Sequence, residues 1–153
     1  MATEILPAAG TSSLHRGTAV RLINSGARIL LGFIFFATGL NGILQFVAMP
    51  AMQGNAATFM AGLVASGYVF PVLFVTYIVA GGALLANRFV PLALVLLAPA
   101  IVNIFALHLF LDPHGLPLAL VVVALEIFLA WRYREAYRPL FHGRMRTAEV
   151  TTI

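Results

Sequence analysis

The sequence predicts an all-α integral membrane protein, a four-helix bundle with both termini in the cytoplasm. Three observations predict it: the chain carries little charge, it holds four apolar runs long enough to cross a bilayer, and its arginines fall on one side of those runs. Of its 153 residues, 61% are hydrophobic and 9% are charged, whereas a soluble domain has roughly 25% charged residues. Such a chain cannot cover a water-facing surface, and its length allows one domain.

The four apolar runs are residues 28–47, 68–86, 89–111 and 116–133. A membrane helix needs about 20 mostly apolar residues, and these runs are apolar on all sides, as helices that contact lipid and one another should be. We therefore predict four spans within one membrane domain, residues 21–141. Small residues in the first two spans, Gly32 and Gly81 among them, predict close packing between helices.

The arginines set the direction of the spans. All nine basic residues are arginines: Arg16, Arg21, Arg28, Arg88, Arg132, Arg134, Arg138, Arg144 and Arg146. The segments 48–67 and 112–115 hold none, so four spans place every arginine on one side, which the positive-inside rule makes cytoplasmic. Because the arginines lie where membrane topology requires them, we expect a lipid bilayer and no nucleic acid as the partner.

The segments outside the spans have their own predictions. Residues 1–20 are polar and predict a mobile N-terminal tail, and residues 142–153 predict a cytoplasmic tail. The first apolar run is too long for a cleaved signal peptide. The basic, aromatic stretch WRYREAYRPLFHGRMR suits an interfacial anchor on anionic lipid, or alternatively a docking site for a cytoplasmic partner.

Two features interrupt the simple pattern of spans. The stretch NAATFMAGLVAS, which starts at Asn55, predicts a short amphipathic helix on the outer membrane surface, although an ordinary apolar loop is the alternative. Pro99 lies inside the third span, where it should free a carbonyl near Val95 and bend the helix.

Polar side chains at membrane depth are the candidate functional residues, because they are costly in hydrocarbon and tend to face a bundle interior or a wet cavity. The candidates are Asn41, Gln45, Tyr77, Asn103, His108 and Glu126. Counted along their spans, they could line one pocket that opens to the outer face. The alternative is that Asn41, Gln45 and Asn103 form hydrogen bonds between helices and bind no ligand.

Glu126 is the candidate that is hardest to dismiss as structural. It lies roughly ten residues into the fourth span and so near the middle of the membrane, with no arginine at its level. We expect it to form the floor of the pocket as a neutral acid that is hydrogen-bonded to Asn103, Asn41 or Tyr77.

The stretch NIFALHLFLDPHG ends the third span with a second polar group. His108 and Asp112 are four residues apart and share one helix face, and Pro113 should end the helix. The two side chains could form a polar cap on the turn, or His108 could have a proton-linked or quinone-linked role. With His114 they offer three metal ligands and no evident fourth, so we predict no metal site. With no cysteine, the chain holds no thiol or iron–sulfur chemistry of its own.

Three stretches, RILLGFIFFATGLNGILQF, AGGALLANRFVPLAL and NIFALHLFLDPHGLPLAL, resemble the DoxX family of small bacterial membrane proteins, and the resemblance covers about residues 25–141. It implies a compact four-helix protein of the bacterial inner (plasma) membrane. Family members are linked to the oxidation of thiosulfate by quinone, or to oxidative-stress assemblies with soluble partners.

Two hypotheses about function follow. In the first, the chain is an accessory or subunit of a quinone-linked redox system, with no intrinsic cofactor, so that electrons come from a soluble or membrane redox partner or directly from substrate. In the second, it is a non-enzymatic binding, transport or assembly protein for a small apolar molecule, and a transporter of this size would require a homo-oligomer. The sequence contains no self-contained catalytic motif for either.

Overall fold

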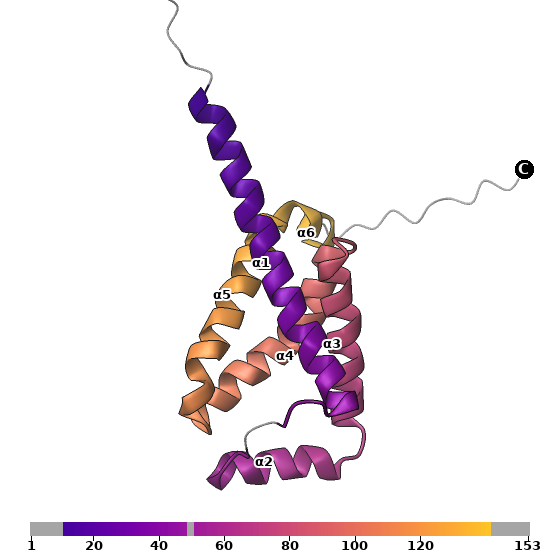
Figure 1. The fold of residues 1–153 in the computed structure, drawn as a ribbon. Helices are drawn as coiled ribbons and strands as arrows, with labels where there is room; N and C mark the ends of the chain where they lie inside the picture. The colour runs from indigo at the N-terminus through magenta and orange to yellow at the C-terminus, as the bar shows by residue number, and fades with distance from the viewer. Residues whose placement is uncertain (1–10, 49–50, 142–153) are drawn as a thin grey trace, which may run out of the picture.

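A computed structural model describes residues 11–48 and 51–141, and its described part is helical without strands. The elements are α1 (Thr11–Leu44), α2 (Gly54–Ala65), α3 (Val69–Leu85), α4 (Val90–Phe110), the 3₁₀ turn η1 (Pro113–Gly115), α5 (Leu116–Arg132) and α6 (Arg134–Phe141) (Figure 1). The predicted cytoplasmic tail, residues 142–153, lies outside the described residues.

Four helices, α1, α3, α4 and α5, form the bundle. α1 packs mainly against α3, while α4 packs against both α3 and α5, and α1 also contacts α5. The N-terminal part of α1, the α3–α4 turn and α6 lie at one end of the bundle, which we call the α6 end. α2 and the turn between α4 and α5 lie at the opposite end, which we call the α2 end (Figure 1).

Three of these helices are long and apolar enough to cross a membrane: Thr18–Leu44, Val90–Phe110 and Pro113–Arg132. α3 has 17 residues, the short end of the range for a spanning helix. It joins α2 at an angle of 90° across a short break. The helix predicted from Asn55 is therefore confirmed as α2, which begins at Gly54.

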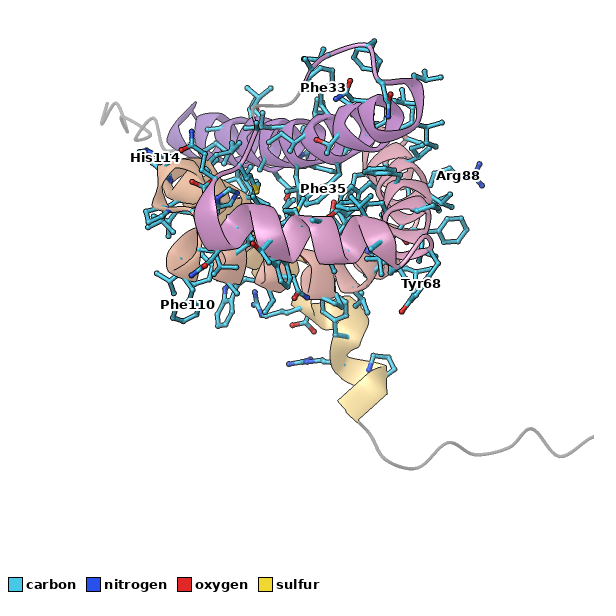
Figure 2. All side chains as sticks on the ribbon, turned by 90° about the horizontal axis from the view of Figure 1, so that it is seen from below. Phe33, Phe35, Tyr68, Arg88, Phe110 and His114 are labelled. Carbon is cyan, nitrogen blue, oxygen red and sulfur yellow. The ribbon has the colours of Figure 1, made fainter. Side chains whose placement is uncertain are left out.

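The core of the bundle is made of leucine, alanine and aromatic side chains from all four helices, Leu31, Leu84, Leu97 and Leu129 among the most buried. Many large apolar side chains are exposed instead. Phe33, for example, lies at the edge of the bundle, whereas Phe35 lies between the helices (Figure 2). Apolar surface on this scale is expected where helices face lipid and not water.

The first helix differs from its predicted span at both ends. α1 begins at Thr11 and therefore includes residues 11–20 of the stretch predicted as a tail. These residues contain no proline, so nothing of that kind stops the helix there. α1 ends at Leu44, and Gln45 follows with φ +51°, so the predicted span 28–47 is too long at this end. The side chain of Asn41 explains this early end.

Candidate functional site

The amide of Asn41 ends α1 and does not point into a pocket between helices. Its Nδ2 donates to the carbonyl of Val47 at 3.0 Å, and its Oδ1 accepts from the N–H of Val47 at 2.7 Å. Gln45 lies in this turn and is exposed. Both residues thus belong to the local turn that follows α1, in which the Asn41 side chain bonds to both backbone groups of Val47.

Asn103 also bonds within its own helix. Its side chain is exposed, and Nδ2 donates to the carbonyl of Pro99 at 2.8 Å, four residues back. Thr76 does the same on α3, where its hydroxyl donates to Val72 at 2.8 Å. Such bonds to the i−4 carbonyl satisfy a polar side chain without a partner helix. Asn103 therefore neither bonds to Glu126 nor joins two helices.

His108 closes the turn at the α2 end. Its Nδ1 lies 3.0 Å from the carbonyl oxygen of Asp112 and 3.5 Å from the carboxylate of that residue. The imidazole packs directly on Gly115, so closely that a side chain there would collide with the ring. His114 is exposed at the periphery (Figure 2). The described residues contain no group of three metal-ligating side chains.

Tyr77 lies in the core of the bundle. Its side chain is 7% exposed, and its ring meets that of Phe35 edge-on, with ring centres 5.0 Å apart and planes inclined by 68°. This geometry is the favourable one for two aromatic rings. Tyr77 thus contributes packing between α1 and α3.

Glu126 is buried at the centre of the inward face of α5. That face is formed by Ala119, Val122, Glu126 and Leu129, which recur at helical spacing and are all buried. Glu126 is 8% exposed, and its Oε2 has no hydrogen-bond partner. The predicted bonds from Asn41, Asn103 or Tyr77 to this carboxyl group are not formed, because both amides bond to nearby backbone and Tyr77 packs on Phe35.

A group at the α6 end, Tyr137 on α6, interacts electrostatically with Glu126. Burial raises the pKa of Tyr137, and the charge of Glu126 raises it further, which requires the two groups to be near one another. The Tyr137 hydroxyl donates to the carbonyl of Pro91, at the start of α4, at 3.2 Å. Sequence reasoning assigned this tyrosine to an interfacial anchor and gave no sign that α6 folds back on α4.

A second polar contact lies at the same end. The Asn24 amide donates to the Tyr133 hydroxyl at 3.5 Å, and its Oδ1 is buried without a partner. One turn further along α1, the buried guanidinium of Arg28 donates to the carbonyls of Leu84 and Leu85, the second at 3.3 Å. The sequence assigned Arg28 a topological role only, and its spacing from Asn24 was the available sign of a shared face.

The candidate residues are therefore divided between the two ends of the bundle. Asn41, Gln45 and His108 belong to turns at the α2 end, and Asn103 faces outward from α4. Glu126 and the newly found Asn24 and Tyr137 lie inside the bundle or towards the α6 end.

Comparisons with protein-family models, with curated proteins and with solved structures found no match to this chain.

Proposed function

We propose that the chain is a four-span protein of the bacterial plasma membrane, with α1, α3, α4 and α5 as the spans and both termini in the cytoplasm. The distribution of charge supports this. The arginines within the described residues, Arg16, Arg21, Arg28, Arg88, Arg132, Arg134 and Arg138, belong to the segments at the α6 end, and the segments at the α2 end carry none. The positive-inside rule then makes the α6 end cytoplasmic.

The position of α2 agrees with this orientation. This helix turns by 90° from α3 and lies across the α2 end of the bundle (Figure 2). Phe59 and Val64 are exposed apolar residues on it. A helix with such side chains, held across the direction of the spans, suits a membrane surface, and the proposed orientation makes that surface the outer one.

We infer that the protein serves as an accessory or subunit of a membrane assembly and that the chemistry belongs to a partner. One observation carries this proposal: Asn41, Asn103 and His108 bond to nearby backbone groups, so they do not converge on a reacting group. The resemblance to DoxX proteins supports a quinone-linked redox assembly. In such an assembly the cofactor of a partner would handle the electrons.

A second candidate function, a binding protein for a small molecule, is favoured by Glu126. A buried carboxyl oxygen without a partner costs free energy that a bound group could recover. A transport role on four short spans would require several copies of the chain around one path.

Purification in mild detergent tests the two candidates. An accessory subunit should copurify with a stoichiometric partner protein, identified by mass spectrometry, and quinone should be found in that complex. Glu126→Gln should release a bound molecule that Asn103→Leu retains, if the molecule contacts the buried acid. A homo-oligomer without partner protein or quinone would contradict the accessory role.

A further inference from the structure

We propose that Glu126 is a proton-binding site that exchanges with the cytoplasm through the α6 end of the bundle, with Tyr137 at its entrance. The sequence had suggested the opposite direction, a pocket open to the outer face. The inference rests on the orientation proposed above. It goes further because it assigns a proton as the ligand of Glu126 and names the end of the bundle through which that proton exchanges.

The first support is the burial of Glu126 without a partner. The side chain is 8% exposed on the packed face of α5, and Oε2 makes no hydrogen bond. A buried polar atom in a native structure is satisfied in the great majority of cases, and exceptions occur at functional sites. A carboxyl group can take up a proton, which removes the cost of a bare charge among apolar groups.

The second support is the depth of the residue. α5 runs from Leu116 at the α2 end to Arg132 at the α6 end. At a rise of ~1.5 Å per residue, Glu126 is about 9 Å from Arg132 and about 15 Å from Leu116. The shorter route to water therefore runs through the α6 end.

The third support is a set of polar side chains at the α6 end. Tyr137 lies near enough for the charge of Glu126 to raise its pKa, and its hydroxyl bonds to the carbonyl of Pro91. Asn24 and Tyr133 meet at the same end, where the buried Oδ1 of Asn24 also has no partner. Hydroxyl and amide groups in this arrangement can bond to waters that carry a proton.

Several other ionisable groups on the helices around α5 either bond to groups other than Glu126 or lie at the α2 end. The guanidinium of Arg28, on α1, bonds to the last carbonyls of α3. On α4, His108 lies at the α2 end beside Asp112 of the following turn, and η1 contributes only His114 there. On α6, Glu135 pairs with Arg138 at 2.9 Å.

Labelling of the unaltered protein in sided vesicles tests the proposal. Dicyclohexylcarbodiimide crosses membranes and adds to a protonated carboxylic acid, whose proton moves to the reagent nitrogen. The modified residue is identified by mass spectrometry of peptides. In inverted vesicles, labelling of Glu126 should fall as the pH of the medium rises and should not depend on the pH of the lumen. In right-side-out vesicles, labelling should fall as the pH of the lumen rises and should not depend on the pH of the medium.

Two other acids of the chain serve as internal controls for orientation. A membrane-impermeant quaternary ammonium carbodiimide should label Glu135 only in inverted vesicles and Asp112 only in right-side-out ones. The opposite result for these two residues would refute the proposed orientation itself. If they behave as expected but Glu126 follows the pH of the outer face, or is not labelled at any pH, the proton site proposed here is wrong.

A matched pair of variants tests the route. Tyr137→Ala removes the side chain at the proposed entrance and should speed labelling of Glu126 several-fold. Tyr68→Ala removes an exposed tyrosine at the α2 end (Figure 2) and should leave the rate unchanged. The reverse result would place the entrance at the α2 end and overturn the proposal.

Discussion

Gly81 lies where the backbones of α1 and α3 approach closely. A Cβ atom built there would lie 2.6 Å from the backbone nitrogen of Phe36 and 2.8 Å from the carbonyl oxygen of Gly32. Because backbone atoms cannot move aside as a flexible side chain can, Gly81→Ala should separate the helices and cost about 1–3 kcal/mol. Thermal unfolding in detergent measures this loss.

The neighbouring glycine provides the control for this prediction. A Cβ at Gly82 would lie 3.7 Å from the Phe36 ring, an ordinary contact, and alanine is favoured over glycine in a helix by about 1 kcal/mol. Gly82→Ala should therefore keep or raise the unfolding temperature. Equal losses in the two variants would show that α1 and α3 do not approach at Gly81.

Asn103 shows where sequence reasoning about single residues stops. The sequence shows that Asn103 is a polar residue in an apolar span, but it does not show which group the side chain bonds to. The carbonyl of Pro99, four residues back, competes with any partner on another helix. Asn103→Leu should change the free energy of unfolding by no more than about 0.5 kcal/mol, as for other surface substitutions. A loss of several times that size would show that Asn103 bonds between helices.

At the scale of elements, the turn between α4 and α5 depends on one pair of residues. The imidazole of His108 packs on Gly115 and lies 3.0 Å from the carbonyl of Asp112. Gly115→Ala should displace the ring and destabilise the protein. In a His108→Ala background the same change should cost less, because the ring is gone. The difference, measured by a double-mutant cycle of unfolding free energies, should lie in the range of about 0.5–3 kcal/mol; no difference would contradict the contact.

The end of α3 depends on Arg28 of α1. Its guanidinium donates to the carbonyls of Leu84 and Leu85 in the last turn of α3, where the Leu84 carbonyl also accepts from the N–H of Asn87 at 3.1 Å. Arg28→Met keeps much of the volume but removes the donors, and it should cost about 1.5–3 kcal/mol, the value of hydrogen bonds to a charged group. Arg21→Met, at an exposed position of the same helix, should leave the unfolding temperature nearly unchanged.

The sequence predicted the number and positions of the bundle helices well, and their ends less well. The four apolar runs located α1, α3, α4 and α5, although only three of the described helices are long and apolar enough by themselves to cross a membrane. The end of α1 at Leu44 was missed because it depends on a side-chain bond from Asn41 to Val47, and hydropathy carries no information about such bonds.

At the scale of the whole molecule, the direction of the candidate site depended on tertiary structure. Sequence spacing placed Asn41, Asn103 and Glu126 at overlapping depths, but it could not state which way each helix turns its faces. In the structure, Asn103 points outward while Glu126 points inward. The return of α6 onto α4, through Tyr137 and Pro91, is a contact between distant segments that no local pattern predicts.

The orientation of the whole bundle can be tested directly because the chain contains no cysteine. Ala86→Cys at the α6 end and His114→Cys at the α2 end introduce single thiols at exposed positions and leave every arginine in place. A membrane-impermeant maleimide should label His114→Cys in intact spheroplasts and Ala86→Cys only in inverted vesicles, since α4 separates the two positions. The unaltered chain, which has no thiol, provides the blank. Labelling of both variants from one side would mean that α4 does not cross the membrane, and an exchange of sides would mean that the arginines do not set the topology.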